Sequence, residues 1–210
     1  MKYFFDTEFI EGFHKPLFGK RRHFIDLISI GIVAEDGREY YAISNEYNYA
    51  DADDWVKENV ILPLYKETVH GDARNVFTIE NFNKHFGLSN KQIAERVFQF
   101  CTNDFLSIDK AKLYNAVKED IEFYAYYADY DWVVFCSLFG RMIDLPKGFP
   151  MYCKDLKQIL DEKVGGFPRD FEANLKLLKS RLSYPKQENE HNALDDARWN
   201  FKLFNFLKSI

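Results

Sequence analysis

The first eight residues constrain the fold of this chain more than any other segment. From Lys2 to Glu8 the chain contains three consecutive aromatic residues, Tyr3, Phe4 and Phe5, which put large rings on both faces of an extended backbone. A strand that is apolar on both faces is buried from both sides, as in the middle of an α/β sheet. The chain therefore needs a sheet with helices over each face.

Further apolar segments supply neighbours for this strand. Residues 24–34 have a strand pattern, the turn Glu35-Asp36-Gly37 follows them, and residues 38–43 return antiparallel to them. Residues 119–127 predict another strand. Residues 9–23, which contain two glycines and a proline, are predicted to form a loop.

Helical patterns alternate with these strands. The predicted helices are 51–61 ending before Pro63, 89–100 capped by Ser89, 130–139 ending at Gly140, 154–164 and 193–207. No repeat, low-complexity tract or linker divides the chain. We therefore expect one α/β domain, residues 1–210, with helices on both faces of a mixed sheet. Residues from about 50 to 118 are polar and carry no evident chemistry, and the longer segment 45–118 is a candidate elaboration of the core fold.

Charge and cysteine content narrow the class of protein. The net charge is −5, so binding to a nucleic acid must depend on a local surface and not on bulk electrostatics. The three cysteines, Cys101, Cys136 and Cys153, have a spacing that fits neither a disulfide framework nor a zinc site. No segment approaches the roughly 18 apolar residues of a membrane span, and Asp6 leaves no room for a signal peptide. We expect a soluble, cytoplasmic protein with no membrane partner.

Three acidic residues stand where predicted strands end. Asp6 and Glu8 lie two positions apart on the first strand, so their side chains share one face, and such a pair is unfavourable unless a cation compensates it. Asp131 lies where a strand gives way to a helix, the place where open α/β sheets present ligand-binding groups. Asp129 is an alternative, but the apolar run after Asp131 places Asp131 in the first helical turn.

The segment His191-Asn192-Ala193-Leu194-Asp195-Asp196 opens the last helix. Asn192 can cap this helix with Asp195 as its acidic partner, which leaves His191 outside the first turn and able to move. Asp196 lies inside the helix, where the backbone can aim its carboxylate. The segment thus offers one fixed metal ligand, Asp196, and one mobile base, His191.

Taken alone, each of these residues has a structural explanation, as an exposed acid, a helix cap or a surface histidine. Taken together, four carboxylates form an all-oxygen ligand set suited to Mg²⁺ or Mn²⁺. Phosphodiester hydrolysis by two such cations, about 3.5–4 Å apart, needs an anionic site of this kind. We expect His191 to take the proton of the attacking water.

The same residues resemble a known family. Asp6-Thr7-Glu8, Tyr130-Asp131 and residues 191–197 resemble, in this order, the three motifs of the DEDDh 3′→5′ exonucleases, which have a ribonuclease-H-like fold. The stretches FFDTEFIE, IDLISIGIVAEDGREYYAIS and YADYDWVVFCSLFG are most similar to the polyadenylate-specific exoribonuclease AS group. One position departs from the superfamily pattern: Tyr127 stands where many members have an asparagine, four residues before the middle aspartate.

The resemblance implies a ribonuclease-H-like mixed five-stranded sheet and two divalent cations, Mg²⁺ or Mn²⁺. The metal ligands would be Asp6, Glu8, Asp131 and Asp196, and the base His191. It also implies hydrolysis of single-stranded RNA from its 3′ end to nucleoside 5′-monophosphates, and a homodimer. The alternatives are a DNA exonuclease of the proofreading type and an inactive nucleic-acid-binding module of the same fold. The inactive module is disfavoured, because it has no reason to keep uncompensated acids together.

Two further groups are candidates for substrate contact. Phe9 and Ile10 directly follow the acid pair, where a terminal base can stack or be wedged, and core packing is the alternative for both. The basic run Lys20, Arg21 and Arg22 can hold backbone phosphates, although such a run is also typical of a solvated loop.

Overall fold

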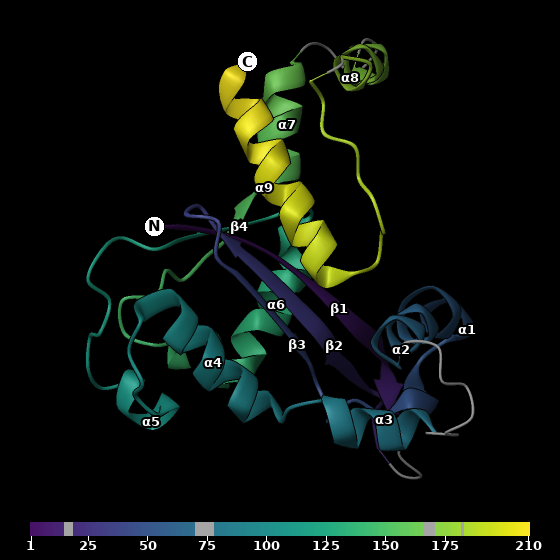
Figure 1. Cartoon of the computed structure of the whole chain (residues 1–210), viewed down its shortest axis with the longest axis vertical. Helices are drawn as coiled ribbons and strands as arrows, with labels where there is room; N and C mark the ends of the chain where they lie inside the picture. Colours follow the sequence, from purple (N-terminus) through teal and green to yellow (C-terminus); the bar gives the residue numbers. More distant parts are fainter. Residues whose placement is uncertain (15–18, 70–77, 166–170, 182) are drawn as a thin grey trace.

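A computed structural model describes residues 1–14, 19–69, 78–165, 171–181 and 183–210. Its centre is one five-stranded sheet with the strand order β3-β2-β1-β4-β5, drawn in Figure 1. The strands are β1 (Lys2–His14), β2 (Arg22–Ala34), β3 (Glu39–Ile43), β4 (Glu122–Ala125) and β5 (Lys154–Asp155). The first three pair antiparallel, and β4 and β5 add in parallel to β1. The expected mixed five-stranded α/β fold is confirmed and is consistent with a ribonuclease-H-like arrangement.

The hairpin of β1 and β2 is longer than predicted. The predicted loop over residues 9–23 is wrong, because β1 continues to His14 and β2 begins at Arg22; residues 15–18 lie outside the described part of the chain. On β1, Gly12 leaves room for the ring of Phe24, which a Cβ atom would meet at 2.8 Å. A register shift between Glu8 and Phe9 accommodates one extra residue on β2.

The parallel strand β4 covers only the first part of β1. It pairs with Lys2, Tyr3 and Phe4, and the chain then leaves the sheet for helix α6 (Ala128–Phe139). Tyr127 makes this sharp exit in a left-handed conformation, with φ of 56°. On this side, β1 has no strand partner beyond Phe4 in the described structure, which leaves backbone groups available for side chains.

Helices cover both faces of the sheet, as expected (Figure 1). The elements outside the sheet are η1 (Tyr49–Asp51), α1 (Asp54–Val56), η2 (Lys57–Ile61), α2 (Leu62–Val69), α3 (Ile79–Phe86), α4 (Asn90–Thr102), α5 (Ile108–Ala111), α6, η3 (Met142–Asp144), α7 (Leu156–Val164), α8 (Phe171–Lys179) and α9 (Ala193–Ser209). One face packs against α4 and α6, and the other against α9 and α7.

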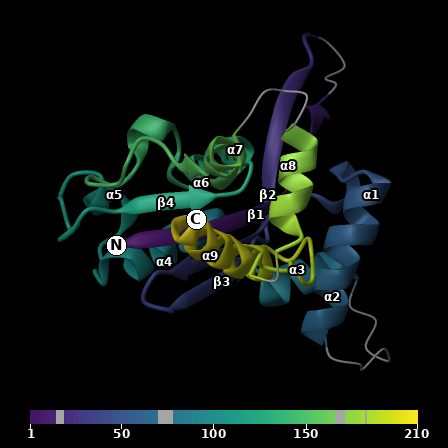
Figure 2. The ribbon, with the colours of Figure 1, turned by 90° about the horizontal axis from the view of Figure 1, so that it is seen from above.

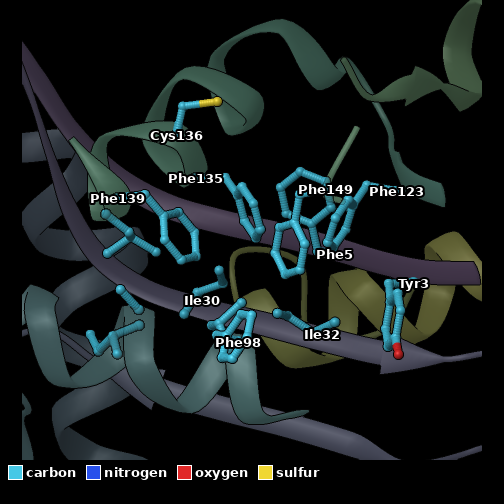
Figure 3. Close-up of a cluster of buried hydrophobic side chains, with 14 of the residues drawn as sticks. Tyr3, Phe5, Ile30, Ile32, Phe98, Phe123, Phe135, Cys136, Phe139 and Phe149 are labelled. Atoms are coloured by element: carbon cyan, nitrogen blue, oxygen red, sulfur yellow. The ribbon is translucent and has the colours of Figure 1, made fainter. Parts of the chain in front are cut away.

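The α4–α6 face holds a large aromatic cluster, shown in Figure 3. Phe123 and Phe135 lie at its centre with ring centroids 4.8 Å apart, and Phe5 approaches Phe135 to 5.4 Å. Each fully buried ring stabilises the fold by roughly 1.5–3 kcal/mol relative to an exposed one. This cluster fixes α6, and with it Asp131, against β1.

The segment 45–118 contributes to both the core and the surroundings of the sheet. As predicted, Ser89 caps α4 and forms a capping box with Gln92. The predicted helix end before Pro63 is wrong, because the π-helical turn η2 leads directly into α2, which includes Pro63 in its first turn. Because proline has no amide hydrogen, the continuous helix lacks one backbone hydrogen bond at Pro63. Among the described residues, no helix is long and apolar enough to cross a membrane.

Candidate active site

Asp6 and Glu8 project from the face of β1 that packs against α9. Alternation along the strand puts Phe4 and Ile10 on this face and Thr7 on the other. Carboxylate oxygens of Asp6 and Glu8 lie within 4.8 Å of each other and of one from Asp196. The predicted convergence of the first strand and the last helix therefore occurs.

The start of α9 is held directly against the sheet. Asn192 caps the helix as predicted, and its side-chain oxygen accepts from the amides of Leu194 and Asp195. Helix and sheet touch at Gly31 of β2, where a Cβ atom would come within 2.2 Å of the Ala193 carbonyl oxygen. Only glycine permits this approach, which brings the first turn of α9 over the partner of Asp6 in the strand ladder.

Asp196 is buried in this first turn and accepts two hydrogen bonds. The Gln187 side-chain amide donates to its Oδ1 at 2.6 Å, and the His191 backbone amide donates to its Oδ2 at 2.9 Å. The expected capping role of the Asp195 carboxylate is wrong, because that carboxylate accepts from Arg198 and Asn189. Asp195 and Asp196 thus point to different surroundings, although they are adjacent.

Asp131 reaches the site from the opposite face of the sheet. It lies in the first turn of α6, as predicted, and is 7% exposed, whereas the alternative Asp129 is exposed. The Thr7 amide and hydroxyl both donate to Oδ1 of Asp131, at 2.9 and 2.6 Å. Thr7 can do so because its side of β1 has no strand partner at this point. Asp131 is close enough to raise the pKa of Asp6, but it lies outside the 4.8 Å group.

Burial disfavours ionisation of all four carboxyls, and repulsion from neighbouring acids of the cluster adds to it at Asp6, Glu8 and Asp131. Burial raises the pKa of Asp6 well above its ordinary value, and the charges of Asp131, Glu8 and Asp196 add to this effect. Burial followed by the charges of Asp196 and Asp131 raises the pKa of Glu8 to about 8. For Asp131, burial raises the pKa to about 6 although the hydrogen bonds from Thr7 oppose it. Burial also raises the pKa of Asp196.

The residues present fit a hard divalent cation. Among the described residues, no lysine or arginine forms an ion pair with any of the four carboxylates. Clustered buried acids without a cationic partner are costly, and a bound cation would remove that cost. Because every donor is a carboxylate oxygen, the set favours Mg²⁺ or Mn²⁺ over zinc, which takes histidine and cysteine more readily.

His191 lies beside the acids, in a segment with unusual backbone angles. Its φ is 71° and that of Asn189 is 50°, both in the left-handed region. The imidazole packs edge-on against Trp55, with ring centroids 4.8 Å apart. A cavity of about 130 Å³ lies next to it, between residues 189–192 and helix α2. Part of the segment 45–118 therefore borders His191.

The two candidate base-contacting residues have different environments. Phe9 is partly buried and stacks on Tyr130 of α6, with centroids 6.1 Å apart and planes at 11°. Ile10 is 1% exposed and packs with Ile28 and Phe82 in the core beneath the 45–86 elements. A base cannot reach a side chain without exposed surface, so the prediction for Ile10 is corrected to core packing.

Several residues of the site were not predicted from the sequence. Thr7 holds Asp131, Gln187 holds Asp196, and Trp55 contacts His191. Asn200 is 1% exposed and donates from Nδ2 to the Phe5 carbonyl oxygen at 3.0 Å, which ties α9 to β1 just before Asp6. Of these residues, only Asn200 has a feature in the sequence that could have indicated its role. It is a polar residue one turn after Asp196, on a helix face that is otherwise apolar.

The chain is similar to known proteins over nearly its whole length. A model of the family described as 3′-5′ exoribonuclease Rv2179c-like domain matches residues 1–207. The chain is 32% identical over 209 residues to two proteins of Mycobacterium tuberculosis, each aligned over 100% of this chain and 94% of the relative. They are the 3′-5′ exoribonuclease Rv2179c of strain ATCC 25618 / H37Rv and the 3′-5′ exoribonuclease MT2234.1 of strain CDC 1551 / Oshkosh.

Proposed function

The chain belongs to the family of the Rv2179c-like 3′-5′ exoribonuclease domain, and we propose that it hydrolyses single-stranded RNA from the 3′ end with two divalent cations. Within the exonucleases, we assign it to the DEDDh group and its polyadenylate-specific AS branch, on the motifs around Asp6, Asp131 and Asp196. The products would be nucleoside 5′-monophosphates. The observation that carries the proposal is the convergence of Asp6, Glu8 and Asp196 within 4.8 Å, with no cationic side chain among the described residues to pair with them.

The four carboxylates would hold the cations together. Asp6, Glu8 and Asp196 would share them, and Asp131 would contribute the carboxylate oxygen that Thr7 leaves available. When bound, Mg²⁺ or Mn²⁺ supplies neutralising charge at the scissile phosphate and lowers the pKa of the attacking water. The rigid placement of Asp6 on β1 and Asp196 on α9 reduces the reorganisation needed during the reaction.

His191 would accept the proton of the attacking water. Its backbone amide already binds Asp196, so the imidazole stays at the edge of the acid cluster while its ring contacts Trp55. General-base catalysis of this kind contributes typically 10²- to 10⁴-fold to a rate. The leaving 3′-oxygen would take a proton from solvent.

We assign RNA and not DNA as the substrate because of the family. Digestion of matched RNA and DNA oligomers distinguishes these two substrates. The central experiment is a time course on 5′-labelled RNA with Mg²⁺, with Mn²⁺ and with excess chelator. A ladder that shortens from the 3′ end and needs the cation supports both polarity and metal dependence. Full activity of the metal-stripped protein in chelator would falsify the two-cation mechanism.

A pair of adjacent aspartates provides a matched control. Asp196→Asn removes a proposed ligand and should reduce activity to near background. Asp195→Asn removes the same charge one residue away, where the carboxylate pairs with Arg198 at 2.7 Å, and should keep most of the activity. Equal loss in both variants would mean that the charge of the helix start, and not ligation by Asp196, supports activity.

A further inference from the structure

The outer part of the β1–β2 hairpin extends well past the acid cluster. We call this part the arm and define it as residues 9–14 and 19–27. From Glu8 to His14 the strand advances about 20 Å at its usual rise per residue. In Figure 2 the outer part of β2 rises beyond the ends of the neighbouring helices. The arm therefore extends the strand that carries Asp6 and Glu8.

The arm concentrates unpaired positive charge in an acidic protein. Lys20, Arg21 and Arg22 are all exposed, and none of the described carboxylates forms an ion pair with them. The arm also holds two acids, Glu11, which is hydrogen-bonded to His23 at 2.8 Å, and Asp26 near its base. The whole chain has a net charge of −5, whereas this cluster of three residues is positively charged. A polyanion approaching the acid cluster would be attracted here first.

The arm also presents an aromatic ring with an arginine beside it. Phe13 is 53% exposed, the Arg21 guanidinium lies 4.7 Å from its ring centroid, and the His23 ring contacts its edge at 5.3 Å. Phe13 lies four positions after Phe9, so both rings project from the same face of β1. Nucleic-acid bases are suitable stacking partners for an exposed aromatic ring that already carries an arginine.

We propose that the arm binds the RNA strand on the 5′ side of the scissile bond, with Lys20, Arg21 and Arg22 on backbone phosphates and Phe13 against a base. This inference rests on the proposed function, because the 3′ end of the strand must lie at the acid cluster. Combined basic and aromatic side chains along a track are the usual means of holding single-stranded nucleic acid without sequence preference.

The geometry predicts that the arm acts only on substrates long enough to reach it. Phe13 stands about 17 Å along β1 from Glu8. A dinucleotide held by its 3′ end at the acids is too short to span this distance. An oligomer of about twelve nucleotides, within the range of sites that single-strand-binding proteins cover, is long enough. The arm should therefore lower KM for the long substrate and leave the dinucleotide unaffected.

The test removes the three cations and compares two substrates. The variant Lys20→Ala/Arg21→Ala/Arg22→Ala should raise KM for the long RNA roughly 10- to 100-fold at 0.1 M salt, with kcat nearly unchanged. The slope of log KM against log salt should fall by up to about 2, since each lost phosphate contact on a single strand accounts for about 0.7. Cleavage of the dinucleotide should stay at the wild-type rate. Phe13→Ala should raise KM for the long RNA with no change in salt slope.

A matched control carries the same loss of charge elsewhere. Lys176, Lys179 and Arg181 are exposed on and just after α8. Changing these three to alanine alters net charge equally and should leave KM for both substrates near the wild-type value. If this control variant raised KM as much as the arm variant does, the loss of net charge alone would explain the effect and the proposal would be overturned.

Other outcomes distinguish this proposal from the proposed function. Suppose that the wild-type protein cleaves both RNAs and that the arm variant has the wild-type KM for the long RNA. This result would overturn the proposed role of the arm and leave the proposed exoribonuclease function intact. Wild-type protein that cleaves neither RNA would overturn the proposed function itself. If the arm variant keeps its KM but changes from dimer to monomer in sedimentation, the arm binds a second copy of the chain and the RNA proposal is wrong.

Discussion

In the absence of a cation, the protein should lose stability as the pH rises from about 5 to 8. Glu8 has a pKa of about 8 in the folded chain, against an ordinary value of 4.5. Its folded pKa is the higher one, so the folded chain holds its proton more tightly than the unfolded chain does. The resulting stabilisation is complete below about pH 4.5 and is lost as the pH rises through about 8. Asp6, Asp131 and Asp196 have raised pKa values and act in the same direction.

The size of this effect follows from the environment of Glu8. At about 1.4 kcal/mol for each pH unit between 4.5 and about 8, the ceiling is close to 5 kcal/mol for Glu8 alone. Because the side chain is partly accessible to solvent, we take about half, or roughly 2–3 kcal/mol. With a urea m value of about 2–3 kcal/mol/M, the unfolding midpoint should fall by about 1 M.

The assay is urea unfolding of chelator-treated protein at several pH values across this range. Glu8→Gln should unfold at a higher urea concentration than wild type near pH 8 and should depend less on pH. Glu35→Gln is the control, because Glu35 is paired with Lys2 at 3.1 Å and lies far from the acids in the ladder. Saturating Mn²⁺ should remove most of the wild-type decline, since the cation binds ionised carboxylates. A metal-free midpoint that is constant or rises from pH 5 to 8 would refute the reasoning.

Three further predictions concern individual residues of the site. Gly31→Ala should destabilise the fold by about 1–3 kcal/mol and weaken Mn²⁺ binding, since a Cβ atom would collide with the start of α9. Gly37→Ala is the control, because Gly37 has a φ of +89° and a Cβ atom there would meet nothing within 4 Å; it should lower thermal stability without changing Mn²⁺ affinity. Equal Mn²⁺ affinities in the two variants would contradict the role of Gly31. His191→Ala should lower the rate about 10²- to 10⁴-fold while calorimetry still detects Mn²⁺ binding, and a wild-type rate would end its assignment as the base. Asn200→Ala should cost about 1–3 kcal/mol and weaken Mn²⁺ binding, whereas Asn83→Ala, which removes a buried hydrogen bond to Tyr47, should affect stability alone.

The sequence by itself determined which local elements carry Asp6, Glu8, Asp131 and Asp196. Strand alternation places Asp6 and Glu8 on one face of β1. Asn192 marks the start of α9 because asparagine is preferred as a helix N-cap, where its side chain accepts from amides two and three residues later. The apolar run after Asp131 placed it correctly in the first turn of α6. These features could be predicted because each depends on residues within a few positions along the chain.

The tertiary structure decided how the acids meet. Thr7 and Asp131 are 124 positions apart, and Phe5 and Asn200 are 195 apart, so no local pattern predicts their hydrogen bonds. The burial of Ile10 likewise depends on the helices of the segment 45–86, which pack beneath β1 and β2. The placement of Asp196 over β1 is set by contacts such as Gly31 against the start of α9, where a single Cβ atom would separate helix and sheet. Contacts of this kind form only when the sheet and helix are packed together, because they depend on the space left between two backbones and not on the preference of either segment.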